Sequence, residues 1–203
     1  FSEYKVIILP QMIIGKPDVI ERVKSFVTEG GIAVLTYRSS VKDADNNFVF
    51  GKCIPVGYSD FAGVTVVETE SLQSGQEMAL IGADGSVGEG SIFRDFLEVD
   101  GAEVLYHYGD SFYTDYAAVT RKAQGEGMIY YIGCGLDEAT NAKLMNQIME
   151  DASVATEETE EGVEVAYRGK EGDRVRMVMN HNPYAVEKGA YKLAPFESYI
   201  ERI

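Results

Sequence analysis

The chain has 203 residues, of which 45% are hydrophobic and 11% aromatic, so it can bury a substantial core in one domain or slightly more. Its 33 acidic and 18 basic residues give a net charge of −15, which disfavours binding to nucleic acids and to anionic membrane surfaces. No apolar run is long enough to span a bilayer, and Cys53 and Cys134 lack the spacing of a zinc site or a disulfide framework. We therefore expect a cytoplasmic protein without a metal or other cofactor.

The first forty residues predict a strand, a helix and a second strand. Residues 4–9 form an apolar run rich in β-branched side chains, as in a buried strand, and residues 32–37 form a second one. Between them, Pro17 suits the first turn of a helix and Gly30 suits its end. The helical repeat is carried by Val19, Ile20, Val23, Phe26 and Val27. The two strands should be parallel neighbours.

The middle of the chain predicts a more irregular, antiparallel region. Residues 41–61 have the composition of a long loop, and the glycine-rich segment 82–90 is expected to be flexible. Asp137 is expected to cap a helix that returns over the sheet. Alternating apolar residues predict strands at 64–68, 102–108, 117–122 and 128–133.

Composition also predicts the domain organisation. The segment TEETEE, residues 156–161, carries four glutamates and no apolar residue, which is typical of a solvated linker. We therefore expect a first domain at 1–154, an acidic linker at 155–161 and a small β domain at 162–203. Strands of that small domain are expected at 163–167, 175–179 and 199–203.

Two sequence patterns resemble ligand sites but lack required residues. The run Asp43 to Asn47 begins like a calcium loop, yet Phe48 and Ile54 stand where such a loop needs glycine and glutamate. The glycine-rich segment 82–90 is not followed by the Lys-Ser or Lys-Thr pair that holds phosphates. Neither a metal site nor a nucleotide site is expected.

Cys134 is the strongest candidate for a nucleophile, because it is predicted at a strand-to-helix turn where a thiolate would be favoured. A base would have to come from His107 or His181, which we expect to be satisfied structural histidines. Acidic pairs such as Glu68 and Glu70 are expected to be solvated. This leaves two alternatives open for Cys134, a catalytic thiol or a small packing residue.

The stretch GGIAVLTYRSS ends a predicted parallel strand with Tyr37, Arg38 and Ser39. The carboxyl ends of such strands are where α/β proteins usually bind their ligands. These three residues are therefore candidates for a functional site, and their chemistry depends on what the rest of the chain resembles.

The segments YKVIILP, ERVKSFVTEGGIAVLTYRSS, GAEVLYHYGDSFYTDYAAVTRKAQGEGMIYYIGCGLDEA, GVEVAYRG and MVMNHN together resemble β-galactosidases of glycoside hydrolase family 42. The resemblance covers nearly the whole chain and corresponds to the trimerisation domain and the small C-terminal β domain of that family. It implies an α/β fold, namely a class I glutamine amidotransferase-like (flavodoxin-like) three-layer domain with a parallel core and antiparallel additions, followed by a small all-β domain.

The family's trimerisation domain normally begins with a further strand, helix and strand. The resemblance therefore implies that residues 4–9 lie at an unpaired edge of the sheet. Exposed apolar edges favour pairing with another copy, so we expect either non-native self-association or poor order near the amino terminus.

The resemblance also implies how the chain functions. The catalytic glutamates of the family belong to a preceding (β/α)8 barrel, so no catalytic or metal residue is assigned here and the chain itself is expected to be inactive. The expected partners are further copies in a homotrimer and the catalytic barrel of the parent enzyme, with a galactoside bound only through the parent. The alternative is a stand-alone amidotransferase-like enzyme with Cys134 as nucleophile.

In the amidotransferase-like fold, the turn after a central strand holds a cysteine nucleophile, but here it consists of Tyr37, Arg38 and Ser39. These residues are candidates for a subunit interface or for lining a substrate pocket completed at that interface. Arg38 is the first choice because its planar guanidinium can make bidentate or stacked contacts. A local bond from Arg38 to a loop carbonyl or carboxylate is the alternative.

Overall fold

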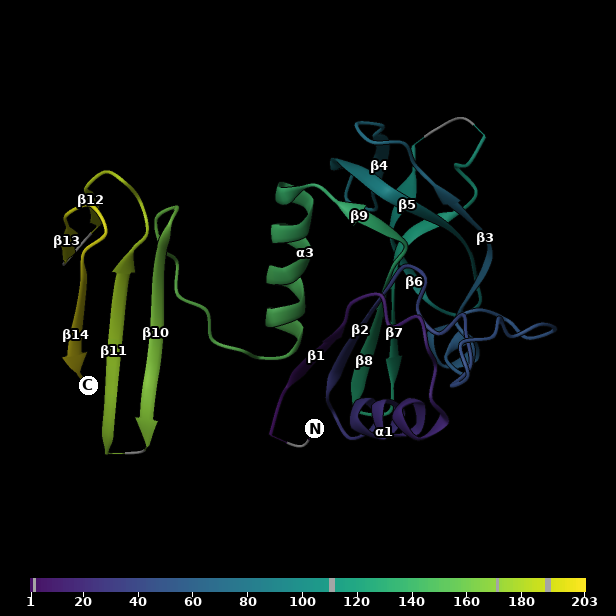
Figure 1. Cartoon of the computed structure of the whole chain (residues 1–203), viewed down its shortest axis with the longest axis horizontal. Coiled ribbons are helices and arrows are strands. Elements are labelled where there is room, and N and C mark those ends of the chain that lie inside the picture. Colours follow the sequence, from purple (N-terminus) through teal and green to yellow (C-terminus); the bar gives the residue numbers. More distant parts are fainter. Residues whose placement is uncertain (2, 110–111, 171, 189–190) are drawn as a thin grey trace. The chain divides into compact units, whose positions relative to one another are not determined.

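The computed structural model describes all residues except 2, 110–111, 171 and 189–190, and it divides into two compact units, Phe1–Val154 and Ala155–Ile203 (Figure 1). Each unit is described by itself. The helices and strands described in the first unit are β1 (Val6–Leu9), α1 (Pro17–Thr28), β2 (Ile32–Thr36), α2 (Ser59–Ala62), β3 (Val64–Ser71), β4 (Met78–Gly82), β5 (Val87–Val99), β6 (Glu103–Tyr108), β7 (Ala117–Gln124), β8 (Gly127–Ile132), β9 (Cys134–Leu136) and α3 (Glu138–Asp151).

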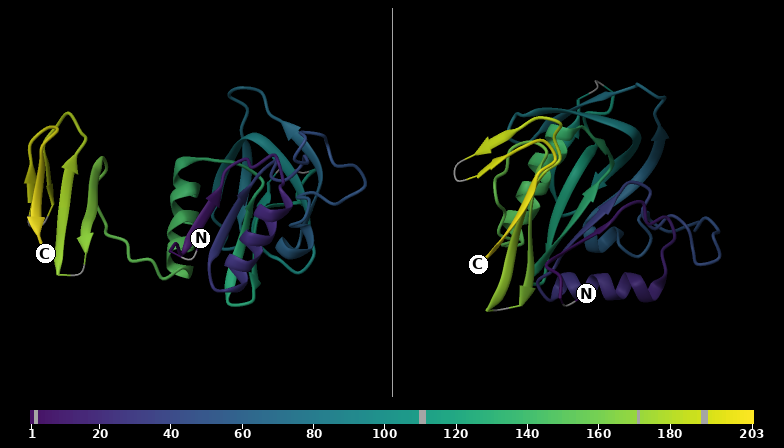
Figure 2. Two further views of the ribbon diagram at one scale, coloured as in Figure 1. Left: turned by 60° about the horizontal axis from the view of Figure 1, so that its bottom comes forward. Right: turned by 60° about the vertical axis from the view of Figure 1, so that its left-hand side comes forward.

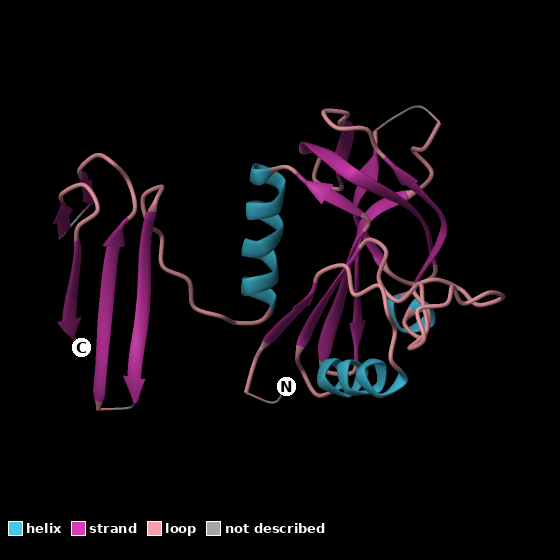
Figure 3. Cartoon of the chain, viewed as in Figure 1, coloured by secondary structure: helices cyan, strands magenta, loops and turns pink. Residues whose placement is uncertain are grey.

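The described part of the first unit forms a nine-stranded mixed sheet (Figure 3). Its strand order is β1-β2-β8-β7-β6-β4-β5-β3, and β9 pairs with β5. The strands β1, β2 and β8 are parallel, with Val6 opposite Ile32 and Ile32 opposite Met128, whereas the other pairs are antiparallel. The predicted mixed sheet and its parallel β1–β2 pair are confirmed, and β1 lies at the edge of the strand order.

The two larger helices pack on opposite faces of this sheet. Along β2, Ala33 and Leu35 belong to the core cluster that contains the buried side of α1. The alternate residues Ile32 and Val34 belong to the other cluster, which contains the buried side of α3. Figure 2 shows the two helices on different sides of the strands. Successive residues of a strand point to opposite faces, so the apolar run of residues 32–35 in β2 fits a strand that is covered on both faces.

Helix α1 begins and ends where the sequence predicts. Pro17 occupies its first turn, where the missing N–H costs nothing, and Gly30 follows its end with a φ of 107°. The next residue, Gly31, has no room for a side chain, because an added Cβ would lie 2.3 Å from the ring of Phe26. Glycine here lets the chain turn tightly from the helix into β2.

The expectation that residues 82–90 are flexible is wrong for most of that segment. Strands β4 and β5 form an antiparallel hairpin there, and β5 continues to Val99. The glycines are needed for close packing, because an added Cβ would lie 2.0 Å from Thr140 Oγ1 at Gly88 and 2.7 Å from Met78 Cε at Gly90. The sequence pattern also did not predict the short elements α2 and β9.

The second unit contains strands β10 (Val163–Lys170), β11 (Asp173–Asn180), β12 (Val186–Lys188), β13 (Tyr191–Leu193) and β14 (Ser198–Arg202). Strands β10, β11 and β14 form an antiparallel sheet, and β12 pairs with β13 in a hairpin that the sequence analysis did not predict. The buried core of the second unit consists of Val163, Val178, Val186 and Leu193.

Residues 155–161, the predicted acidic linker, contain neither helix nor strand. One of its glutamates is nevertheless held in place. The carboxylate of Glu157 accepts a hydrogen bond from the Tyr167 hydroxyl (2.5 Å) and pairs with the Arg176 guanidinium. Glu157 remains exposed, as expected for this segment, but its carboxylate is bound to β10 and β11 of the second unit.

Candidate functional site at the end of β2

The turn that follows β2 has an unusual backbone. Arg38 and Ser40 have φ angles of 60° and 52°, in the left-handed region that side chains other than glycine rarely adopt. Such residues persist only where the surrounding structure holds them, and they concentrate at functional sites. The turn is therefore a candidate site on backbone geometry as well as on sequence.

A buried carboxylate holds this turn in place. Asp95, on β5, is completely buried, and its Oδ2 accepts hydrogen bonds from the Arg38 backbone N–H (3.0 Å) and the Tyr131 hydroxyl (2.7 Å). Its Oδ1 accepts a hydrogen bond from the Thr69 hydroxyl (2.6 Å). Burial raises the pKa of the Asp95 carboxyl, although these hydrogen bonds and the charge of Arg38 act in the opposite direction. Asp95 was not among the residues that the sequence analysis selected.

Ser39 and Ser40 stabilise the backbone of the turn through their hydrogen bonds. Both are fully buried. The Ser39 hydroxyl donates to the Thr36 carbonyl (2.6 Å), and the Ser40 hydroxyl donates to the Val56 carbonyl (2.6 Å). The Ser40 backbone N–H also donates to the Met12 carbonyl (2.8 Å). Of the three candidates, Ser39 is thus placed to fix the backbone and not to reach a partner with its side chain.

Tyr37 and Arg38 are half-buried and both contact Phe93. The Tyr37 and Phe93 rings have centroids 5.4 Å apart, and the Arg38 guanidinium carbon lies 5.0 Å from the centroid of the Phe93 ring. The Arg38 guanidinium thus makes a cation–π contact with Phe93, and its charge also acts on the buried Asp95 carboxyl. The local bond to a carboxylate that the sequence analysis considered comes from the Arg38 backbone, not from its side chain.

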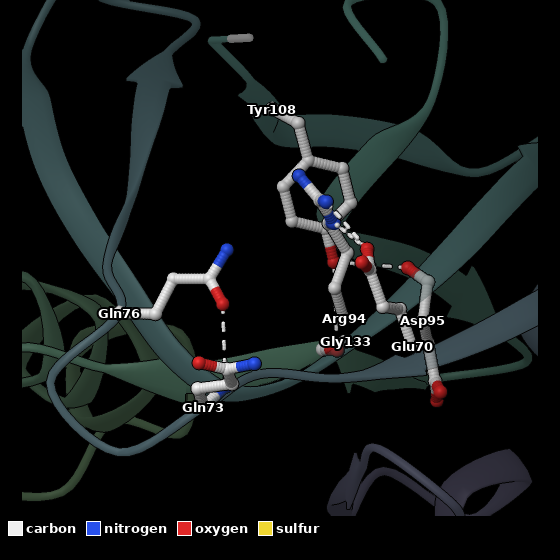
Figure 4. A network of polar contacts seen from close by, with 7 residues as sticks. All are labelled: Glu70, Gln73, Gln76, Arg94, Asp95, Tyr108 and Gly133. Carbon is white, nitrogen blue, oxygen red and sulfur yellow. Dashed lines mark hydrogen bonds and ion pairs between the residues drawn. The ribbon is translucent and has the colours of Figure 1, made fainter. Parts of the chain in front are cut away.

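A second polar network includes Glu70, Arg94 and Tyr108 and also involves the backbone of Asp95 (Figure 4). Arg94 is almost fully buried, and its Nε donates to Glu70 Oε2 (3.0 Å) while its guanidinium lies 4.1 Å from the centre of the Tyr113 ring. The Tyr108 hydroxyl donates to the Asp95 carbonyl (2.9 Å). The expectation that Glu70 is merely solvated is therefore wrong, because its carboxylate pairs with a buried cation and fixes β3 to β5.

Cys134 does not have the surroundings of a nucleophile. It begins strand β9 instead of lying at the start of a helix, since α3 begins after Asp137. Only 1% of its surface is exposed, and burial together with the nearby charge of Asp95 raises the pKa of its thiol to about 12. At neutral pH the group is a protonated thiol, which is a poor nucleophile. The structure therefore does not support Cys134 as a catalytic thiol and places it as a buried packing residue.

The remaining chemical candidates do not form a site. His107 was expected to be satisfied, but its buried Nδ1 has no hydrogen-bond partner in the part of the chain that the structure describes. His181 Nε2 lies 3.1 Å from Glu164 Oε2 on the surface. No group of three or more metal-ligating side chains occurs among the described residues.

The described helices include none that is both long and apolar enough to cross a membrane.

Comparisons with known proteins identify relatives of the chain. The family described as "Beta-galactosidase trimerisation domain" matches residues 1–155. A β-galactosidase of Alicyclobacillus acidocaldarius is 33% identical over 193 residues, which cover 91% of this chain and 28% of the relative. The crystal structure of a β-galactosidase from Bacillus circulans sp. alkalophilus superimposes with a TM-score of 0.91 and 27% identity, covering 98% of this chain and 33% of that one.

A further structure, that of Gan42B, a GH42 β-galactosidase from G. stearothermophilus, superimposes with a TM-score of 0.89 and 25% identity. This superposition covers 100% of the present chain and 32% of the Gan42B chain. The chain thus spans about a third or less of the length of the relatives that it matches. Because the family match extends over most of the sequence, the chain belongs to the β-galactosidase trimerisation domains of glycoside hydrolase family 42.

Proposed function

We propose that this chain is a non-catalytic assembly module of a β-galactosidase that hydrolyses terminal β-D-galactosides. Its role is to hold three identical subunits together, with a catalytic barrel supplied by the parent enzyme. The observation that carries the proposal is the match of residues 1–155 to a trimerisation domain. The parent's galactosidase activity is inferred from the relatives, of which this chain spans only a part.

The chemistry of the chain supports a non-catalytic role. Its one buried thiol, that of Cys134, is protonated at neutral pH. In the turn after β2, the backbone N–H of Arg38 is already bonded to Asp95, so it is not available to stabilise a developing negative charge on a substrate.

We infer that the first unit has a class I glutamine amidotransferase-like arrangement in which the turn after β2 lacks a nucleophile. The support is the parallel β1, β2 and β8 between helices α1 and α3, together with the left-handed backbone at Arg38. We also propose the division into a trimerisation domain at 1–154, a linker at 155–161 and an all-β domain at 162–203.

We propose that Tyr37 and Arg38 form part of the subunit interface or of a substrate pocket completed at that interface, with Ser39 fixing the turn beneath them. Both side chains are held against Phe93 and remain half-exposed. A guanidinium already stacked on an aromatic ring loses little conformational freedom when it binds a partner. Arg38→Ala should therefore weaken self-association, whereas Arg168→Ala, which removes an exposed arginine of the second unit, should not.

The test is the solution mass of the chain, measured by light scattering behind a sizing column over a range of protein concentrations. A trimer is expected, and a monomer at every concentration would contradict the proposal. A chromogenic β-galactoside should not be hydrolysed by the purified chain. Turnover that survives repurification would contradict the non-catalytic role.

A further inference from the structure

The long segment between β2 and α2 carries an exposed aromatic pair. Phe50 is 85% exposed and Phe48 is 47% exposed, and their ring centroids are 5.2 Å apart. The backbone of Lys42 forms a bridge to Phe48 on one side and to Ile14 on the other, which ties the segment to the chain that precedes α1. We call Phe48 and Phe50 the aromatic tip. In Figures 1 and 2 the segment that carries Phe48 and Phe50 projects away from the sheet.

The segment has a defined conformation despite its exposure. Asp43 Oδ1 accepts hydrogen bonds from the backbone N–H groups of Asp45 (3.0 Å) and Asn47 (2.9 Å), which closes a tight turn. Asn46 at the centre of this turn has a φ of 65°. These hydrogen bonds keep the pKa of the Asp43 carboxyl below its ordinary value, so at neutral pH it is ionised and the turn is held.

The base of the segment is tied by hydrogen bonds to the connection between β1 and α1. The Gly15 backbone N–H donates to the Lys42 carbonyl (2.8 Å), and the Val41 N–H donates to the Ile13 carbonyl (3.0 Å). A preformed loop loses little conformational entropy when it binds, and this is the usual property of a binding loop on a rigid scaffold. The aromatic tip is therefore held in a fixed position on the surface by the hydrogen bonds of its loop.

The distribution of charged residues indicates which kind of surface binds the tip. Each copy of the chain has a net charge of −15, so two copies repel one another over most of their surfaces. The segment around the tip is different, because Lys42 and Lys52 balance Asp43 and Asp45 there. Contact between copies is least opposed where the surface is locally neutral and apolar.

We propose that the aromatic tip of one copy inserts into the surface of a second copy of this chain. The inference rests on the proposed assembly function, and it assigns a specific contact to that function. A closed ring of three copies uses head-to-tail contacts, so the tip of each copy meets a different surface of the next one. Buried aromatic side chains at the centre of such contacts carry most of the binding energy.

The experiment compares the solution mass of the chain with those of the double variant F48S/F50S and of F50S, by light scattering across a concentration series. The matched control is F196S, which removes a 69% exposed phenylalanine from the second unit, outside the residues matched by the trimerisation family. The double variant should weaken association by about thirtyfold or more, F50S should weaken it in the same direction, and F196S should leave it unchanged. Circular dichroism melting curves show that each variant is folded.

The outcomes separate this inference from the proposed function. If the unmodified chain is a trimer and both tip variants remain trimeric at the same concentrations, the inference is overturned and the assembly function stands. If F196S dissociates the trimer as strongly as F50S, the effect is not specific and the inference is again overturned. If the unmodified chain is monomeric throughout, the assembly function of this chain and the contact assigned to it both fail.

Discussion

The carboxyl group of Asp95 connects three parts of the first unit that are far apart in sequence. It binds the backbone of Arg38 after β2, the hydroxyl of Thr69 on β3 and the hydroxyl of Tyr131 on β8. An acidic residue beside the apolar Phe96 and Leu97 is the sequence signal that could have indicated a buried carboxylate. The sequence could not show which donors would reach it, because all three come from other elements.

Replacing Asp95 by asparagine should reveal how this group titrates. Because the pKa of Asp95 is raised from 3.8 in the folded protein, the folded state retains a proton that the unfolded chain releases. The contribution of this group to stability is therefore full at pH values below 3.8 and is lost as the pH rises through the folded pKa. Asparagine does not titrate, so the stability of Asp95→Asn relative to the parent chain should increase from about pH 4 upward and then level off.

Urea denaturation of the two proteins at a series of pH values measures this difference. A difference that does not change with pH would show that the Asp95 pKa is ordinary in the folded protein. A difference of opposite slope would show that the three hydrogen bonds outweigh burial and lower the pKa.

The two cysteines should differ sharply in reactivity. Cys53 is exposed, whereas Cys134 is buried and the pKa of its thiol is raised to about 12. With iodoacetamide at pH 7.5, the native chain should be modified at Cys53 only, and modification of Cys134 should require denaturant. Peptide mass spectrometry locates the label. Modification of Cys134 in the native chain at a rate comparable to that of Cys53 would contradict the structure at this site.

At the scale of elements, local signals predicted some strands and missed others for physical reasons. The β1–α1–β2 unit was predictable because apolar runs, a proline and a glycine define it within about thirty residues. Strand β5 was not predictable, because its glycines made the segment look flexible. These glycines are needed where α3 and β4 approach the strand closely, which the local sequence does not show. The turn after β2 was recognised as a candidate site from its position, but its left-handed backbone and its bond to Asp95 depend on the assembled sheet.

Helix α3 depends on a cap that also binds β5. Asp137 Oδ1 accepts a hydrogen bond from the Thr140 N–H (2.9 Å), and its Oδ2 accepts one from the Glu89 N–H (2.6 Å). Asp137→Ala should therefore destabilise the first unit by about 1–2 kcal/mol, the usual cost of a lost N-cap. Asp137→Asn keeps one acceptor oxygen, which can retain the hydrogen bond from the Thr140 N–H but not the one from the Glu89 N–H, so it should lose less stability than Asp137→Ala. Thermal melting of both variants makes the comparison, and equal losses would show that the cap hydrogen bonds are unimportant.

The same cap adds a dependence on acid. The hydrogen bonds lower the pKa of Asp137 to about 2, so its stabilising effect is present above pH 3.8 and is lost as the pH falls towards 2. The Asp137→Asn variant should lack this part of the acid sensitivity.

At the scale of the whole molecule, the dominant property is charge. Copies that each carry −15 must associate against mutual repulsion. Because the Debye length falls from about 10 Å at 0.1 M salt to about 3 Å at 1 M, added sodium chloride should strengthen self-association. Light scattering at both salt concentrations measures the effect. Weaker association at high salt would show that attractive ion pairs, and not apolar contacts, hold the copies together.

The bond between Arg38 and Asp95 has a consequence for protein engineering. A tight turn after a parallel strand is a position at which hydrolases mount a reactive serine or cysteine. Introducing cysteine at position 38 would nevertheless give an inert variant, because the adjacent buried carboxyl disfavours a thiolate and already occupies the backbone N–H. A designer who wanted a new active site here would have to replace Asp95 first and then find another acceptor for Tyr131 and Thr69.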